Sequence, residues 1–234
     1  MDRRTVVITG ASDGIGAAAA RQLAASGESV VLVGRSAAKT AAVAAEIGTP
    51  YHVADYAELG QVRRLAGELA AAYPRIDVLA NNAGGIMGAR EETVDGFERT
   101  LQVNHLAPFL LTGLLMPTLI ASSARVIQTA SIAAQRFGRL DLDDLGNRRR
   151  YSPNTAYGDA KLANILFTRE LHRRYAPQGI SAVAFHPGVV ATSFASETTS
   201  WFRWIYRTPV GRLFLDSRMR AGGGWSGWRR ACRG

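Results

Sequence analysis

Tyr157 and Lys161 are the pair of residues whose types and spacing most clearly suggest chemistry. They are four residues apart, so a helix would place both side chains on one face. A tyrosine hydroxyl has an ordinary pKa of about 10, and a neighbouring ammonium favours the phenolate and lowers that pKa. Such a pair can act as general acid or base toward a carbonyl or alcohol oxygen. One such pair alone is a weak signal, so other residues of the chain must show whether it belongs to a catalytic site.

Lysine is rare in this chain, and this adds weight to Lys161. Of 28 basic residues, only Lys39 and Lys161 are lysines. A chain that favours Arg so strongly keeps Lys where Arg cannot replace it, because a compact ammonium can join proton transfer while a guanidinium stays charged. Ser131 follows a predicted strand and offers a small hydroxyl donor as a third member of the site. Taken alone, Ser131 is more typical of a turn.

A glycine-rich turn connects the first predicted strand to the first predicted helix. Residues 10–16 read Gly-Ala-Ser-Asp-Gly-Ile-Gly. Glycines allow a tight turn and let the backbone approach a pyrophosphate, which a helix N-terminus attracts. The turn is not a P-loop, because no Gly-Lys-Ser or Gly-Lys-Thr ends it. The pattern predicts a dinucleotide site; a turn with no ligand is the alternative.

Arg35 stands directly after the second predicted strand, where cofactor preference is set in dinucleotide folds. An acid there binds the ribose 2′-hydroxyl, whereas an Arg accommodates a 2′-phosphate. Arg35 therefore favours NADP(H), and Ser36 offers a further hydrogen bond. Asp13 is acidic where a second basic residue would help, which leaves NAD(H) as the alternative cofactor. A solvated loop residue is the other interpretation of Arg35.

The elements that must position these residues alternate between strand and helix. Short β-branched runs predict strands over 5–9, 29–33, 51–53, 76–80, 124–129 and 180–185. Helices are expected over 14–25, 36–47, 57–72, 97–120 and 152–175. Ser36 and Ser152 are the expected N-caps of two of them, and Pro108 and Pro117 are expected kinks. The alternation predicts an α/β fold, a doubly wound (Rossmann) parallel sheet with helices on both faces and its ligands beyond the carboxyl ends of the strands.

Taken together, the motifs resemble the short-chain dehydrogenase/reductase family. The resemblance is carried by TGASDGIG at 9–16, NNAG at 81–84, Asn104 within Val-Asn-His, Ser131, YGDAK at 157–161, and Pro187-Gly188 followed by Thr192. The interval between Ser131 and Tyr157, together with FHPGVVAT at 185–192, is similar to the retinol dehydrogenase-like and WW-domain oxidoreductase-like branch. The similarity covers about residues 5–195 and fades beyond them.

The resemblance implies a role for each matching residue. Its catalytic set corresponds to Asn104, Ser131, Tyr157 and Lys161. Its cofactor contacts correspond to Gly10, Ser12, Asp13, Gly14, Ile15, Gly16, Arg35, Asp55, Asn82, Ala83, Gly84, Tyr157, Lys161, Pro187, Gly188, Val190 and Thr192. In the reductive direction Tyr157 delivers a proton to the carbonyl oxygen and Ser131 donates a hydrogen bond to it, while hydride comes from NADPH. Lys161 holds the nicotinamide ribose, and Asn104 anchors a water. The implied substrates are retinoids, steroids and other lipophilic carbonyls or alcohols, and no metal is expected.

Composition limits the remaining possibilities. The chain has 234 residues with 47% hydrophobic, enough for one sizeable core, and its single cysteine excludes an internal disulfide. No room for a signal peptide precedes the first strand, and no apolar run of about 18 residues occurs, so a cytoplasmic protein without integral membrane association is expected. The net charge is +9, but residues 201–234 hold eight Arg against one acid, so the remainder is nearly neutral. Nucleic acid is therefore not expected as a partner.

Two segments and two partners are expected. Residues 1–195 form the NADP(H)-binding catalytic domain, and residues 196–234 form an atypical Trp/Arg/Gly-rich segment, a lid or a tail, with no recognisable seventh strand. The expected partners are a small-molecule substrate and a second copy of the chain, bound through the helices that carry Asn104 and Tyr157. One alternative is a non-catalytic dinucleotide-binding or sensor protein of the same fold. Another is an interaction protein that uses the basic segment on acidic membranes or nucleic acid.

Overall fold

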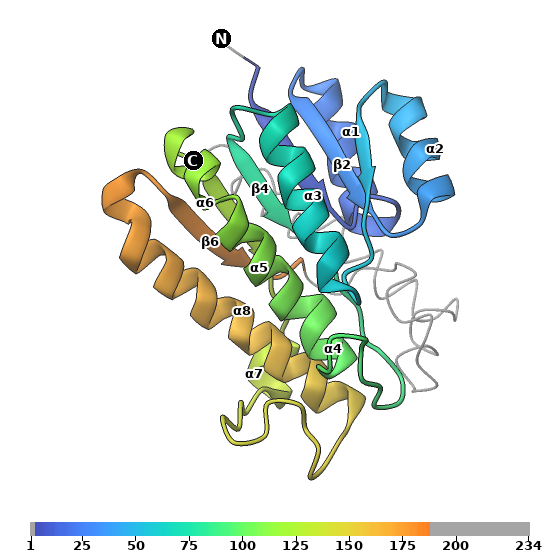
Figure 1. Cartoon of the computed structure of the whole chain (residues 1–234), viewed down its shortest axis with the longest axis vertical. Helices are drawn as coiled ribbons and strands as arrows, with labels where there is room; N and C mark the ends of the chain where they lie inside the picture. Colours follow the sequence, from blue (N-terminus) through green and yellow to red (C-terminus); the bar gives the residue numbers. More distant parts are fainter. Residues whose placement is uncertain (1–2, 188–234) are drawn as a thin grey trace, which may run out of the picture.

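The computed structural model describes residues 3–187, and Figure 1 shows their arrangement. Gly188, Val190, Thr192 and the whole 196–234 segment lie outside the described residues, as does any seventh strand that follows them. In chain order the elements are β1 (Thr5–Thr9), α1 (Gly14–Ala25), β2 (Ser29–Gly34), α2 (Ala37–Ile47), β3 (Tyr51–Val53), α3 (Leu59–Ala72), β4 (Val78–Asn81), α4 (Arg99–Leu101), the π-helix η1 (Gln102–Leu106), α5 (Ala107–Leu114), α6 (Met116–Ala121), β5 (Arg125–Thr129), α7 (Ala133–Phe137), α8 (Pro153–Tyr175), the 3₁₀-helix η2 (Ala176–Gln178) and β6 (Ser181–Phe185).

The strands form one parallel sheet in the order β3-β2-β1-β4-β5-β6, which confirms the doubly wound fold. The chain moves outward from β1 to β3, then returns to the other side of β1 with β4. This reversal creates the topological switch point beside β1, where such sheets bind their ligands. The glycine-rich turn after β1 and the NNAG run after β4 therefore meet at the same edge of the sheet.

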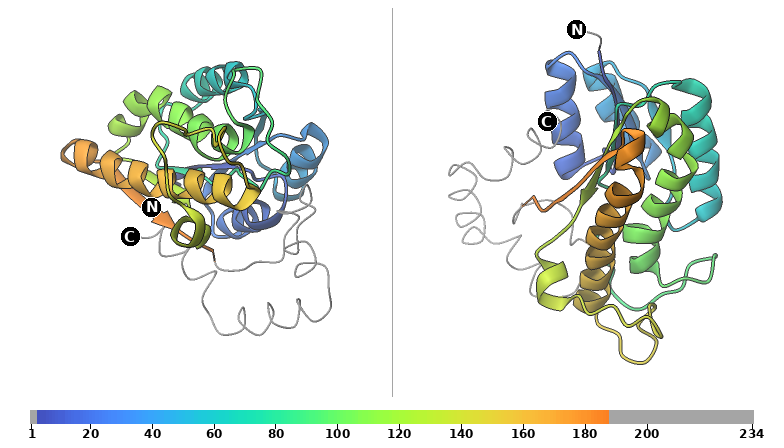
Figure 2. Two further views of the ribbon diagram at one scale, coloured as in Figure 1. Left: turned by 90° about the horizontal axis from the view of Figure 1, so that it is seen from below. Right: turned by 90° about the vertical axis from the view of Figure 1, so that its left-hand side faces the viewer.

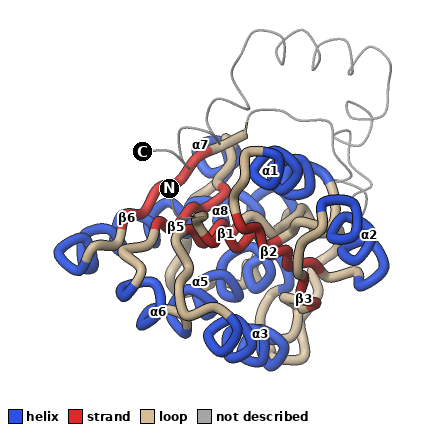
Figure 3. The backbone as a smooth tube through the Cα atoms, turned by 90° about the horizontal axis from the view of Figure 1, so that it is seen from above, coloured by secondary structure: helices blue, strands red, loops and turns tan. Residues whose placement is uncertain are grey.

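Helices cover the two faces of the sheet in separate layers (Figures 2 and 3). Successive residues of a strand point to opposite faces, so β1 contributes Val7 to one core and Val6 and Ile8 to the other. The core around Val7 contains side chains from α3, α5, α6 and α8, and the core around Val6 and Ile8 contains side chains from α1 and α2. Continuous apolar strands are thus explained by burial on both sides.

Local signals explain where several helices begin and end. The Ser36 side chain accepts from the Lys39 amide at the start of α2, and the Ser152 side chain accepts from the Thr155 amide at the start of α8. Both expected N-caps are confirmed. The α2 helix ends at Gly48, whose φ of +63° is a left-handed conformation that glycine adopts without strain.

The expected helical stretch over 97–120 is divided into α4, η1, α5 and α6, and α5 and α6 begin next to the two expected kinks at Pro108 and Pro117. The two prolines stand in the first turns of α5 and α6, and a proline has no amide to donate to the fourth residue before it. Pro108 therefore leaves the Asn104 carbonyl without its usual helical donor. The chain widens into a π-turn at this point, and the Ala107 amide donates to the Gln102 carbonyl. A π-turn of this kind often marks a functional site.

None of the helices within residues 3–187 combines the length and the apolar character that crossing a bilayer would require.

Candidate active site

A cavity of about 530 Å³ opens at the carboxyl-terminal edge of the sheet. It brings together most of the residues singled out from the sequence, although they come from seven separate segments of the chain. The predicted site residues that line it are Gly10, Ser12, Asp13, Gly14, Ile15, Gly16, Arg35, Asp55, Asn82, Ala83, Gly84, Ser131, Tyr157, Lys161 and Pro187. Asn104 does not line it.

The glycine-rich turn and the NNAG run are held against each other by direct contacts. Gly10 has a φ of +66°, and a Cβ there would lie 2.7 Å from the Ala83 Cα. The Thr9 hydroxyl accepts from the amides of Asn82 and Ala83 at 3.0 Å each. The Asn82 side chain donates back to the Thr9 carbonyl at 3.0 Å and to the Gly10 carbonyl at 3.3 Å. Only glycine fits this approach, and the resulting floor of backbone is what a pyrophosphate requires.

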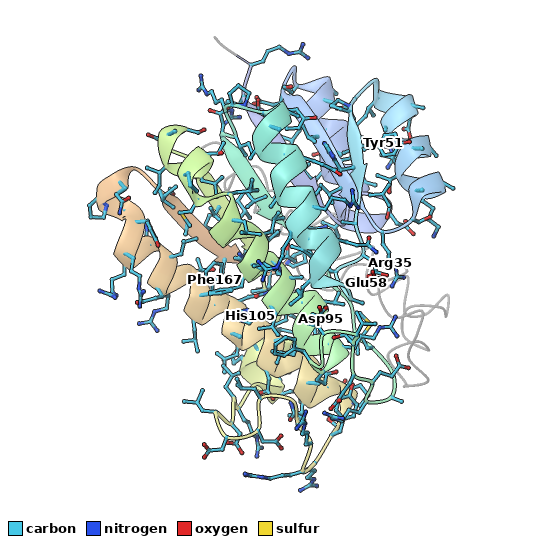
Figure 4. The ribbon with its side chains drawn as sticks, viewed as in Figure 1. Arg35, Tyr51, Glu58, Asp95, His105 and Phe167 are labelled. Carbon is cyan, nitrogen blue, oxygen red and sulfur yellow. The ribbon has the colours of Figure 1, made fainter. Side chains whose placement is uncertain are left out.

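The corner next to β2 contains two exposed cations and one acid. Arg35 and Lys39 both line the cavity, and the Lys39 Nζ lies 3.7 Å from a carboxylate oxygen of Asp13. Asp13 also caps α1 by accepting from the Gly14 amide. Figure 4 shows Arg35 at the carboxyl-terminal edge, away from Tyr51 at the start of β3. From the sequence, the negative charge of Asp13 was taken to disfavour a 2′-phosphate. The ion pair that Lys39 forms with Asp13 was not predicted.

Asp55 follows β3 at the same edge. Its Oδ1 accepts from the Ala57 amide at 2.9 Å, and its own amide donates to the Gln61 side chain at 2.9 Å. These bonds fix the loop between β3 and α3, and Asp55 lines the cavity there.

Tyr157, Lys161 and Ser131 meet at the opposite end of the cavity. The Lys161 Nζ donates to the Thr129 carbonyl at 2.9 Å and lies 5.4 Å from the centre of the Tyr157 ring. The lysine is 1% exposed, and this burial lowers the pKa of its ammonium to about 7. The Ser131 hydroxyl accepts from the Ala133 amide at 3.2 Å, which orients it at the start of α7. A tyrosine, a buried amine and a serine hydroxyl on one cavity wall can exchange a proton with an oxygen bound between them.

Asn104 lies behind the cavity wall, within η1. Its side chain is fully paired, since it accepts from the Gly85 amide and donates to the Gly85 and Thr100 carbonyls at 2.8–3.0 Å. A Cβ on Gly84 would collide with the Asn104 Oδ1 and lie 3.2 Å from the Lys161 Nζ, so these groups pack closely around Gly84. Asn104 therefore holds the 84–85 backbone against Lys161.

Asn164 and His105 are two functional candidates that sequence reasoning missed. The Asn164 side chain donates to the Asn104 carbonyl at 3.0 Å, the carbonyl that Pro108 leaves without a helical donor. The Asn164 Oδ1 lies 2.9 Å from the His105 Nδ1. Asn164 is seven residues after Tyr157, two helical turns along the same face, and this spacing was the signal available in the sequence.

Among the residues that the structure describes, no three His, Cys, Asp or Glu side chains gather as a metal site would require.

The family described as short chain dehydrogenase matches residues 4–203. A protein of Streptomyces sp. (strain C5), named as a candidate daunorubicin C-13 ketoreductase, is 47% identical over 210 residues, which cover 86% of this chain and 71% of that protein. Human retinol dehydrogenase 13 is 38% identical over 219 residues, which cover 90% of this chain and 66% of that protein. This chain thus spans about two thirds of the length of the second relative.

A solved structure of a related protein has a similar fold. A candidate NAD(P)-dependent gluconate 5-dehydrogenase from Beutenbergia cavernae, with bound NADP at low occupancy, superimposes with a TM-score of 0.68 at 33% identity and covers 82% of this chain and 75% of that one. The family match extends over most of the chain, and the solved relative shares its fold. The chain belongs to the short-chain dehydrogenase/reductase family, whose members are oxidoreductases that act on alcohol and carbonyl groups.

Proposed function

We propose that this protein is an NADP(H)-dependent oxidoreductase that interconverts a carbonyl and an alcohol on a lipophilic small molecule, with Tyr157 as general acid and base. The observation that carries the proposal is the joint placement of Ser131 and Tyr157 on the cavity wall, with the buried ammonium of Lys161 beside the tyrosine ring. A protein that only senses a dinucleotide has no use for this arrangement at the far end of the cavity.

The residues present fit a phosphorylated dinucleotide. The floor built by Gly10 and Asn82 suits a pyrophosphate, and Arg35 with Lys39 offers two cations at the corner where a 2′-phosphate would sit. The Beutenbergia cavernae relative, which has bound NADP, supports this choice. Bound NADPH supplies the hydride for reduction of the carbonyl carbon.

The side chains supply the proton and hold the oxygen. In reduction, the Tyr157 hydroxyl gives its proton to the substrate oxygen as the carbon–hydrogen bond forms, and the Ser131 hydroxyl donates a hydrogen bond to the same oxygen. The protonated form of Lys161 stabilises the resulting phenolate. In alcohol oxidation the phenolate takes the hydroxyl proton instead, and the same groups serve in reverse.

A lipophilic substrate is supported by the wall next to Tyr157. Ile86 and Met87 are apolar residues of this wall, and Ile86 packs with Tyr157 and Ala133. One relative is named as a retinol dehydrogenase, and retinol is a mainly apolar alcohol. We therefore propose a substrate with an extended apolar part next to its carbonyl or alcohol group.

Arg35 gives a direct test of cofactor preference. Replacing Arg35 by Ser is expected to weaken NADPH binding about tenfold, because a charge-assisted hydrogen bond to the 2′-phosphate is lost. NADH binding should change by less than about twofold, since NADH has no phosphate there. Arg63→Ser, which removes an exposed arginine from α3, is the matched control. Equal loss of NADPH and NADH affinity in Arg35→Ser, measured by nicotinamide fluorescence, would contradict the assignment.

A second copy of the chain is the proposed protein partner. Phe109 of α5 is 51% exposed, and its ring lies 5.1 Å from that of Phe167 of α8. The His105 ring lies within 6.3 Å of both, and Figure 4 labels His105 and Phe167 side by side. The two helices are those that follow Asn104 and carry Tyr157. Because exposed aromatic rings are costly in water, this face suits a symmetric interface.

Phe109→Glu is expected to convert a dimer into a monomer in light-scattering measurements at micromolar concentration, because it places a charge in the apolar interface. Leu142→Glu is the matched control, since Leu142 is 81% exposed and is not part of the aromatic cluster of Phe109, Phe167 and His105. An unchanged mass for Phe109→Glu would reject this interface.

A non-catalytic dinucleotide sensor of the same fold is the second candidate, and it would bind NADPH equally well. The proposal is tested by mixing the protein with NADPH and a panel of aldehydes and ketones that differ in size and apolar area. Oxidation of NADPH that depends on the carbonyl supports the oxidoreductase. Tight NADPH binding with no oxidation across the panel would favour the sensor.

A further inference from the structure

The segment between Ser131 and Tyr157 packs closely on the helix that carries Tyr157. It begins with α7 and continues as a loop over residues 138–151. A Cβ on Gly158 would lie 2.8 Å from each of the Ala133 carbonyl oxygen, the Phe137 Cβ and the Gly138 amide nitrogen. The backbone of α8 therefore touches α7 at the residue that directly follows Tyr157. This contact relates the position of Ser131 to that of Tyr157.

Asp159, the next residue, binds the loop that follows α7. Its side chain is buried, and the residue is only 5% exposed. Its Oδ1 accepts from the amides of Arg139 at 2.6 Å and Leu140 at 3.0 Å, and its Oδ2 accepts from the Asn147 side chain at 3.1 Å. Tyr157 and Lys161 face the cavity, whereas Asp159 stands between them in sequence and contacts the 138–151 loop. The same part of α8 therefore contacts the cavity through Tyr157 and Lys161 and the 138–151 loop through Asp159.

Two residues of the 138–151 loop have strained backbone conformations, and Asp159 binds both of them. Leu140 has a φ of +39° and Asn147 a φ of +51°, both in the left-handed region that residues other than glycine rarely adopt. These are two of the three residues that donate to Asp159. Strained backbone persists only where its surroundings over-determine it, and it gathers at sites where a fixed shape matters.

The far side of the loop is tied to the segment after β4, whose first residues line the cavity. The Arg90 Nε donates to the Gly146 carbonyl at 3.1 Å, and the Arg148 guanidinium pairs with Glu92 at 3.2 Å. Arg90 and Glu92 belong to the segment that leaves β4 and includes Ile86 of the cavity wall. Figure 1 shows both loops at the carboxyl-terminal end of the sheet. The surface pairs are weak individually, so the buried carboxylate is the main anchor.

We propose that Asp159 is a positioning and specificity-determining residue of the reaction proposed above, on which this inference rests. Through three hydrogen bonds it fixes the 138–151 loop on α8, so that Ser131 stays opposite Tyr157 and the loop holds the segment that carries Ile86. It touches neither substrate nor cofactor. Its loss loosens the segment that carries Ile86 and therefore affects bulky carbonyl substrates more than small ones.

Three variants test this. Asp159→Ala removes all three bonds. Asn147→Gly removes one bond while keeping a residue that tolerates positive φ, so it is the variant expected to fold if Asp159→Ala does not. Asp143→Ala is the matched control, because Asp143 is an exposed acid of the same loop for which no side-chain hydrogen bond is found in the described structure.

Hydrogen exchange of the NADPH-bound protein gives the readout that does not need turnover. The amides of residues 139–140 are expected to exchange at least about tenfold faster in Asp159→Ala, and severalfold faster in Asn147→Gly, than in the wild type or in Asp143→Ala. NADPH affinity should stay within about twofold. Unchanged exchange in both variants would overturn the anchoring role, whether or not the wild type proves to be an oxidoreductase.

Kinetics with a bulky and a small ketone give the second readout. For Asp159→Ala and Asn147→Gly we expect KM for the bulky ketone to rise about five- to tenfold, with kcat for the small ketone within about threefold of wild type. A merely structural defect would lower kcat for both substrates by the same factor, and that result would overturn the specificity role. A wild type that turns over neither ketone would instead count against the proposed function, while the exchange result would still stand.

Discussion

Replacing Tyr157 by Phe is expected to lower carbonyl reduction by about 10²–10⁴-fold, to a barely measurable rate, while NADPH affinity stays within a few-fold. The variant keeps the ring, which packs with Ile86 and Ala133, and removes only the hydroxyl that exchanges the proton. Steady-state kinetics and nicotinamide fluorescence on the same preparation measure both quantities. The loss should fall on kcat rather than on cofactor binding, because the missing group acts on the reacting oxygen.

Tyr73→Phe is the matched control for this experiment. It removes the hydroxyl of a partly buried tyrosine at the end of α3, outside the cavity. Its turnover should equal that of the wild type. If Tyr157→Phe retains comparable turnover, Tyr157 is not the general acid, and another proton donor on the cavity wall must be sought.

Lys161 is expected to make the unfolding free energy of the cofactor-free protein depend strongly on pH. Burial lowers the pKa of Lys161 from its ordinary value of 10.5 to about 7. Between these two values the unfolded chain binds more protons at this residue than the native chain, so the stability contribution rises as the pH increases from 7 to 10.5. Below pH 7 the ammonium is charged in both states, and its burial costs the folded protein on the order of 5 kcal/mol.

Lys161→Met removes this titration, and the difference between variant and wild type isolates it from all other ionisable groups. We expect Lys161→Met to be more stable than the wild type at pH 6, and we expect the gain to shrink by several kcal/mol toward pH 10. Urea unfolding at a series of pH values measures it. A gain that does not change with pH would contradict the lowered pKa.

Lys161→Arg separates charge from proton exchange. A guanidinium stays charged throughout this pH range, so the variant should lose the pH-dependent part of the stability as well. Turnover should be lost in both Lys161 variants, since neither side chain can hold the ribose and stabilise the phenolate as a compact ammonium does. Substantial turnover by Lys161→Arg would show that a fixed positive charge is sufficient.

Most of the fold could be predicted from the sequence, because strand and helix signals are local. The predicted segments over 5–9, 14–25 and 51–53 coincide with β1, α1 and β3. The division of the 97–120 helix was only half predicted: the prolines were recognised as kinks, but the π-turn was not. The π-turn leaves the Asn104 carbonyl without a helical donor. The side chain that donates to this carbonyl instead, Asn164, lies 60 residues further along the chain.

The candidate site was predictable where a motif stands at the end of a strand. Residues such as Gly10, Asn82 and Ser131 follow β1, β4 and β5, and a parallel sheet brings the carboxyl ends of its strands to one edge. Contacts that one side chain makes with a distant residue were not predictable. Examples are the ion pair of Lys39 with Asp13 and the hydrogen bonds of Asp159 to the 138–151 loop. Such pairs depend on tertiary packing, for which neither periodicity nor spacing gives a signal.

Transfer of deuterium from labelled NADPH to a ketone tests the central claim most directly. The protein is incubated with NADPH that carries deuterium at the transferable position of the nicotinamide, together with an apolar ketone, and the alcohol is examined by mass spectrometry and NMR. The account predicts one deuterium on the carbinol carbon for each NADPH consumed, and no product with Tyr157→Phe. An alcohol without deuterium, or NADPH that binds tightly and is never consumed, would contradict it.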